Sequence, residues 1–240
     1  MQKVVHSVTW QKQGPNDCAQ TSASVLLAAL GQPMSVEDIK KDVPVFINAK
    51  GEEIGTSWPH LAAFLKTKGN DVTMHATDIE LLDRSWATLS PDEIIERLHE
   101  RKKHIRHAYH GTDVIEAYVD GYEQFLKAGG RIVFPILTEG YLHQLLLKDP
   151  FIAAVSYNYL NSGPKKVFDQ KKRQWSTDDI SGRTTTHAVV VAGYDSGKFL
   201  IIDADQPSVE AGTRWLDAGH LIGAICLAET EWDNILITVG

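Results

Sequence analysis

Residues 14–31 read GPNDCAQTSASVLLAALG, a turn followed directly by a run of small residues and leucines. Turn-forming residues occupy positions 14–17, and small residues and leucines follow them as far as Gly31. The pattern predicts a helix that begins at or near Cys18 and ends at Gly31. Unpaired N–H groups and the positive end of the helix dipole stabilise a thiolate at such a position. Cys18 is therefore a candidate nucleophile.

The amino-acid composition limits the classes of protein to which this chain can belong. The 240 residues are 43% hydrophobic, which suffices for one sizeable core, and we expect a single domain over residues 1–240. The net charge of −7 argues against nucleic acid or an anionic membrane as a partner. The N-terminal residues lack the apolar region of a signal peptide, and no later run has the length of a transmembrane helix.

Cysteine content adds an expectation about location. The chain has two cysteines, which make no disulfide framework in a domain of this length. Reduced thiols and the lack of a membrane segment favour a soluble, cytoplasmic protein, although export by a route without an N-terminal signal stays open. We expect Cys226, which lies among Ile, Ala and Leu, to be a buried structural thiol.

Two β-branched runs downstream predict an antiparallel hairpin at residues 186–195 and 198–203, with its turn at 196–197. His187 lies nine residues before position 196, and Asp203 lies six residues after position 197. The register therefore brings both to the same end of the sheet. Asp205, two positions further on, stays an alternative to Asp203.

A cysteine at a helix N-terminus, a distant histidine and a carboxylate are the parts needed for attack on an amide. The imidazole of His187 protonates the leaving amine, and Asp203 fixes the tautomer and orientation of that imidazole. An oxyanion hole is also required. The backbone N–H of Cys18 can supply one donor, and a glutamine side chain from the preceding loop can supply the other.

Periodicity and capping signals predict the remaining elements. We expect helices at 33–41, 56–69, 90–109, 112–128 and 141–147, and strands at 3–10, 71–76, 131–136, 151–160, 215–228 and 234–239. The helices within 90–128 have the character of an insertion or cap. The polar residues 161–183 are too many for a hairpin turn and predict a mobile loop.

Four histidines at 99, 104, 107 and 110 invite interpretation as a metal site, since several stand at helical spacing. Basic residues surround them and repel a cation, so a solvated helix face is the better interpretation. We expect neither a metal nor another cofactor in this protein.

The sequence blocks resemble the C39-like branch of the papain-like cysteine peptidases. They are the DCAQTSA block at 17–23 with its leucine-rich helix, THAVVVAGYD at 186–195 and IIDADQP at 201–207. Their order and spacing match over roughly residues 8–70 and 130–225. The resemblance implies an α+β, papain-like fold, in which a helical N-terminal half packs on an antiparallel β-sheet. It also implies a cysteine peptidase that forms a thioester acyl-enzyme on a peptide or protein substrate.

Residue by residue, the resemblance implies that Cys18 is the nucleophile, His187 the general base and acid, and Asp203 the residue that orients His187. A loop glutamine is the implied oxyanion donor. Family members usually carry it six positions before the cysteine, where this chain has Lys12. Gln11 and Gln13 flank that position, and we favour Gln13 because it adjoins the turn that directs the loop. The residue after the cysteine, usually glycine, is alanine here.

Two further functions stay open. The same residues can pass the acyl group to an amine or deamidate glutamine, which would make the chain an acyltransferase or amidase. The alanine at position 19 and the displaced glutamine motivate the other alternative, a non-catalytic peptide-binding relative. The substrate, the cleavage specificity and the oligomeric state are not predicted by the sequence.

Overall fold

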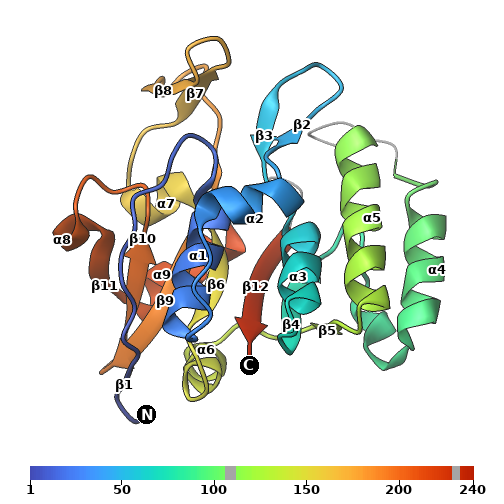
Figure 1. The fold of residues 1–240 in the computed structure, drawn as a ribbon, viewed down its shortest axis with the longest axis horizontal. Helices are drawn as coiled ribbons and strands as arrows, with labels where there is room; N and C mark the ends of the chain where they lie inside the picture. Colours follow the sequence, from blue (N-terminus) through green and yellow to red (C-terminus); the bar gives the residue numbers. More distant parts are fainter. Residues whose placement is uncertain (106–111, 229–232) are drawn as a thin grey trace.

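The computed structural model describes residues 1–105, 112–228 and 233–240 (Figure 1). Within these residues one sheet has eight strands, in the order β11-β10-β9-β6-β12-β4-β5 with β1 paired to β9. Their bounds are β1 Val4–Val5, β4 Val72–Asp78, β5 Arg131–Val133, β6 Phe151–Ser156, β9 Thr186–Asp195, β10 Lys198–Asp203, β11 Thr213–Asp217 and β12 Asp233–Val239. The predicted α+β class is confirmed. The sheet is mixed, however, because β4 and β5 run parallel while the other pairs are antiparallel.

Helices cover both faces of this sheet. They are α1 Cys18–Ala29, α2 Val36–Asp42, α3 Trp58–Thr67, α4 Pro91–Arg101, α5 Thr112–Lys127, α6 Glu139–Leu146, α7 Tyr157–Asn161, α8 Val209–Gly212 and α9 Ala218–Cys226, with a short 3-10 helix at Arg84–Thr88. Alternate residues of β9 point to opposite faces. Val190 packs in the apolar cluster that includes residues of α1 and α3, whereas Val189 and Val191 pack in the cluster that includes α6 and α9.

The two predicted elements that carry the candidate residues are confirmed. Helix α1 begins at Cys18, and Gly31 follows its C-terminus with a φ of 76°, a left-handed conformation that glycine adopts without strain. Strands β9 and β10 form the predicted hairpin around residues 196 and 197, and both turn residues have positive φ. This places Cys18 and His187 at the beginnings of α1 and β9, two elements packed face to face.

Several predicted boundaries are wrong for identifiable reasons. Strand β6 ends at Ser156, whose side chain caps the short helix α7, and β5 stops at Val133, shortly before Pro135, which has no N–H for a ladder. The segment 215–228 contains only the end of β11 and then helix α9. Leu221 and Ile225 of α9 are buried at helical spacing, and Cys226 falls on its exposed side, so the predicted buried thiol is also wrong.

The polar segment 161–183, for which a mobile loop is predicted, contains regular structure. It contains the hairpin of β7 Lys166–Asp169 and β8 Gln174–Thr177. A second hairpin, β2 Phe46–Ile47 with β3 Glu53–Gly55, lies in the N-terminal half. Figure 1 shows both hairpins projecting from the end of the molecule at which α1 begins.

Helices α4 and α5 lie beside the β5 edge of the sheet (Figure 1). Helix α4 starts with a capping box between Ser90 and Glu93 and ends at Arg101, so the helix predicted to run to 109 is shorter, and residues 106–111 lie outside the described part. Leu98 and Phe125 belong to the same apolar cluster as α1 and α3. These helices therefore extend the core on that face. Among the described residues, no helix combines the length and apolar character needed to cross a bilayer.

Candidate active site

The N-terminus of α1 keeps its free N–H groups near Cys18. Asp17 stands at the N-cap position, but its side chain makes no capping bond. Its carboxylate is buried and accepts instead from Lys40 Nζ at 3.2 Å and from Thr21 Oγ1 at 3.4 Å. The first amides of a helix lack internal acceptors, so this end of α1 suits an anion.

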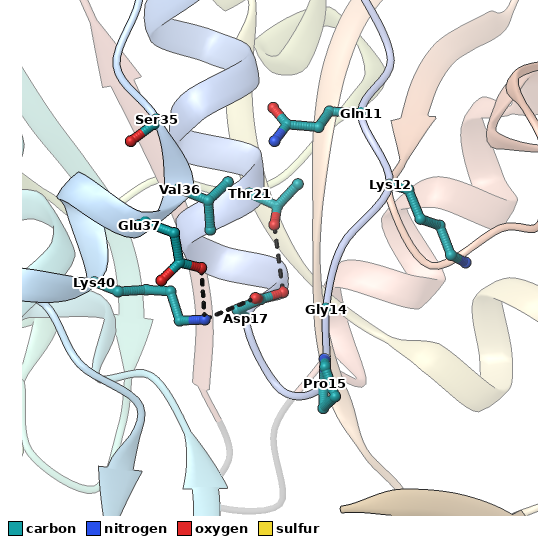
Figure 2. A pocket seen from close by; sticks show the side chains of 10 residues that line it. All are labelled: Gln11, Lys12, Gly14, Pro15, Asp17, Thr21, Ser35, Val36, Glu37 and Lys40. Atoms are coloured by element: carbon teal, nitrogen blue, oxygen red, sulfur yellow. Dashed lines mark hydrogen bonds and ion pairs between the residues drawn. The ribbon is translucent and has the colours of Figure 1, made fainter.

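A cavity of about 430 Å³ lies beside the loop that precedes Cys18 (Figure 2). Figure 2 shows Gln11 and Lys12 on opposite sides of this loop, with Gln11 directed toward α1. Gln11 Oε1 accepts from Ser24 Oγ at 3.3 Å, and Ser24 lies six residues, nearly two helical turns, beyond Cys18. Gln11 is thus held away from the start of α1.

His187 is the second residue of β9 and is only 3% exposed. Its Nε2 lies 2.8 Å from Asp203 Oδ1, and the Asp203 side chain is fully buried. The ring of Tyr157 packs edge to face against His187, with ring centres 5.4 Å apart and planes at 83°. The predicted juxtaposition of His187 and Asp203 is present in the structure.

The side chain of Cys18 interacts with the His187–Asp203 pair through His187. Burial by itself lowers the pKa of His187, but the negative charge and hydrogen bond of Asp203, together with a hydrogen bond to the Cys18 side chain, raise it to about 10. Burial raises the pKa of Asp203, yet the charge and hydrogen bond of His187 outweigh this effect and hold it well below its usual range. At neutral pH the His187 imidazole is therefore a cation, with the Asp203 carboxylate on one side and the Cys18 side chain on the other.

The choice between the two aspartates follows from their contacts. Asp203 also accepts from Gln206 Nε2 at 2.9 Å and from the backbone N–H of Asp205 at 3.0 Å, and Arg214 Nη2 lies 3.5 Å away. The strand ends at Asp203, so the chain turns before Asp205 and their side chains no longer share a direction. Asp203 is therefore the carboxylate that holds His187.

The loop before Cys18 is bound along the segment after Asp203. Gln13 donates from its backbone N–H to Ala204 O at 3.1 Å and from Nε2 to Asp205 Oδ1 at 3.3 Å. Lys12 Nζ lies 2.9 Å from the carbonyl oxygens of both Asp205 and Gln206. Lys12, at the position where a glutamine was expected, thus fastens the loop, and Gln13 faces the segment that carries Asp203.

The hairpin β7–β8 reaches across to the N-terminal half, which the sequence did not indicate. Asn16, two residues before Cys18, donates to Glu53 Oε2 at 3.0 Å and accepts from Trp175 Nε1 at 3.1 Å. Glu53 also pairs with Arg173 Nε at 2.9 Å. Since β3 and β8 are remote in sequence and these pairs have no periodic signal, only the folded chain brings them together.

The histidine cluster does not form a metal site in the described residues. His99 Nε2 contacts Glu123 at 2.7 Å and His104 contacts Glu100 at 3.3 Å, while His107 and His110 lie outside the described residues. No group of three or more His, Cys, Asp or Glu side chains in the described part of the chain is arranged to hold a metal ion.

The family model described as "Peptidase_C39 like family" matches residues 5–224. The chain belongs to this family. The matched span of the C39-like chain includes residues 90–128, which the sequence resemblance had left out. The fold is shared with a crystal structure from Bacillus anthracis provisionally assigned as a C39-like peptidase, at a TM-score of 0.51 and 12% identity, covering 100% of this chain and 98% of that one. No curated protein matches this C39-like chain.

Proposed function

We propose that this C39-like chain is a cysteine peptidase with a papain-like fold, in which Cys18, His187 and Asp203 cleave a peptide or amide bond. One observation carries the proposal: a continuous line of hydrogen-bonding groups runs from the Cys18 side chain through His187 to buried Asp203. The family assignment supports the peptidase class. A histidine with only a structural role would not be expected to contact Asp203 on one side and a cysteine at a helix N-terminus on the other.

The reaction proceeds in two steps. The Cys18 thiolate attacks the substrate carbonyl carbon, a C–S bond forms and the C–N bond breaks, and the imidazolium of His187 gives its proton to the departing amine. Neutral His187 then takes a proton from water as the water oxygen attacks the thioester; the C–S bond breaks, the carboxylic acid leaves, and the Cys18 thiolate and the His187 imidazolium are restored. Asp203 stays ionised throughout and keeps the ring oriented.

Oxyanion stabilisation comes from the Cys18 backbone N–H and the Gln13 side chain. The start of α1 has no side-chain cap that would occupy its first amides. Of the two candidate glutamines, Gln11 is held by Ser24, whereas Gln13 contacts the segment next to the His187–Asp203 pair. An amide nitrogen carries two hydrogens, so Gln13 can donate to Asp205 and to an oxyanion together.

The test is to incubate the protein with a mixture of peptides and to identify products and Cys18 adducts by mass spectrometry. New peptide termini, lost in the Cys18→Ser variant, are the expected result. An acyl adduct on Cys18 that transfers only to added amines indicates the acyltransferase instead, and a mass gain of about 1 Da at glutamine indicates deamidation. Peptide retention without either product or adduct indicates the binding protein.

The expected partner is a peptide or protein, without nucleic acid, membrane or cofactor. Neither Cys18 nor Cys226 is in a disulfide bond, which is consistent with the proposed cytoplasmic location. Fractionation of cells that express the protein would test that location, and peptide binding by the Cys18→Ala variant would test the partner.

A further inference from the structure

Asp205 lies beside the candidate active site and contacts groups from three separate segments. Its Oδ1 accepts from Gln13 Nε2 at 3.3 Å, and its Oδ2 lies 3.8 Å from Lys166 Nζ of the β7–β8 hairpin. Its own backbone carbonyl accepts from Lys12 at 2.9 Å. The side chain is about one-third exposed, so it is not there to fill the core. These contacts make Asp205 a fixed acceptor opposite Gln13.

A carboxylate acceptor determines which end of a glutamine amide faces it. Ionised aspartate has only acceptor atoms, so the nitrogen of Gln13 must face Asp205 and the oxygen must point away. Gln13 Oε1 is buried and has no hydrogen-bond partner among the described residues, so nothing on that side selects the orientation. Without Asp205 the amide could rotate by 180° and present its oxygen where a donor is needed, which an oxyanion would repel.

Asp205 also contacts the residue that packs on His187. The Tyr157 hydroxyl hydrogen-bonds with Asp205, and burial and the negative charge of Asp205 raise the pKa of Tyr157, so the hydroxyl stays protonated and donates. The Tyr157 ring lies against His187, and Lys166 Nζ lies 3.8 Å from the centre of that ring. The carboxylate thereby links the Gln13 loop to the surroundings of His187.

We propose that Asp205 is a positioning residue, which holds the Gln13 amide with its nitrogen toward the developing oxyanion. The inference rests on the proposed function, because it requires Cys18 to form an acyl-enzyme. Asp203 and Asp205 then have separate roles two residues apart: the first orients the base, and the second orients the oxyanion donor.

The experiment measures the burst of p-nitrophenolate when the full chain reacts with the p-nitrophenyl ester of N-acetylglycine. The Cys18 thiolate attacks the ester carbonyl, the C–O bond breaks and p-nitrophenolate leaves without a proton. The burst rate therefore reports the nucleophile and the oxyanion donors rather than acid catalysis by His187. The variants are Asp205→Ala, Asp205→Asn, Gln13→Ala and the double variant, with Asp195→Asn as the control at the far end of β9.

We expect Gln13→Ala to slow the burst by about 10²-fold and Asp205→Ala by roughly 10-fold or more, with KM little changed. Asp205→Asn should recover much of the rate, because its oxygen can still accept from Gln13. The double variant should be no slower than Gln13→Ala, since Asp205 acts through Gln13. Asp195→Asn should match the wild type, and iodoacetamide should alkylate Cys18 at the wild-type rate in Asp205→Ala.

Three results would overturn parts of this scheme separately. An Asp205→Ala burst at the wild-type rate, or a double variant slowed by the product of the single effects, overturns the positioning role alone. Slowed alkylation of Cys18 in Asp205→Ala shows that the whole site has collapsed and also overturns it. A wild-type protein with no burst, whose Cys18 reacts as slowly as a free thiol, overturns the proposed function itself.

Discussion

His187 Nε2 and Asp203 Oδ1 lie 2.8 Å apart, with both side chains buried, at one end of the β9–β10 pair. The pair occupies a site where burial opposes the charge on each partner, so each ion is stable only while the other is present. Cys18 approaches the same imidazole from the N-terminus of α1. The stability of this end of the sheet and the state of the thiol thus depend on one histidine.

Removing Asp203 from its buried pair with His187 should lower the free energy of unfolding more than replacing it with the isosteric asparagine. Asp203→Ala leaves the His187 imidazole in a buried site without its acceptor, and we expect a loss of about 3–5 kcal/mol in the free energy of unfolding. Asp203→Asn should retain more stability, because the amide oxygen can still accept from His187 Nε2, but it should lower activity, because a neutral amide stabilises the imidazolium less than a carboxylate does. Urea unfolding and peptidase assays check both. Equal stability of Asp203→Ala and wild type would contradict the ion pair.

The free energy of unfolding should depend on pH through the ionisation of His187. The pKa of His187 is raised from 6.5 to about 10 in the folded protein. A raised pKa contributes stability that is fully present below 6.5 and is lost as the pH rises through 10. We therefore expect the difference in free energy of unfolding between wild type and His187→Gln to shrink from pH 6 to pH 10. A difference that is constant over this range would exclude the raised pKa.

Cys18 and Cys226 provide a comparison within one molecule. Partial burial raises the pKa of the Cys226 thiol, whereas the Cys18 side chain contacts His187. At pH 6 we expect iodoacetamide to modify Cys18 much faster than Cys226, measured by peptide mass spectrometry. His187→Gln should abolish the difference. Equal modification rates in the wild type would remove Cys18 as the nucleophile.

The two candidate glutamines should differ sharply in effect. Gln13→Ala removes an oxyanion donor and should lower kcat by about 10²- to 10³-fold, with a smaller change in KM. Gln11→Ala removes the contact with Ser24, and we expect activity within about two-fold of wild type, a loss of about 0.4 kcal/mol or less in transition-state stabilisation. Steady-state kinetics of both variants on the same substrate decide between them. The reverse order of effects would assign the role to Gln11.

The contact between the hairpins should control the mobility of β7–β8. Glu53→Gln removes the charge that pairs with Arg173 while retaining the size of the side chain, and we expect faster amide hydrogen exchange in residues 166–177. Glu52→Gln is a matched control, because Glu52 contacts only Asn48 through its side chain in the described structure. The change in global stability should stay under about 1 kcal/mol. Unchanged exchange in Glu53→Gln would show that Arg173 does not hold the hairpin.

Local signals account for the parts of the fold that were predicted. Turn residues before Cys18, a glycine after the helix and two β-branched runs around a short turn each act within a few residues, so α1 and the β9–β10 hairpin could be assigned from the chain alone. The end of β6 depends on one capping residue, Ser156, and the end of β5 on the nearby Pro135, and both ends were misplaced. Helix α9 was missed because a short apolar run fits either period.

Tertiary structure alone decided which residues meet. The sequence determined that Cys18 starts a helix and that His187 and Asp203 share one end of a hairpin, because those relationships follow from periodicity and register. The contact of Cys18 with His187, the attachment of the loop before Cys18 along residues 204–206 and the pairing of Glu53 with Arg173 join segments that are far apart in the chain. No local pattern encodes such contacts, since they form only when helices and sheet pack to bury their common apolar faces.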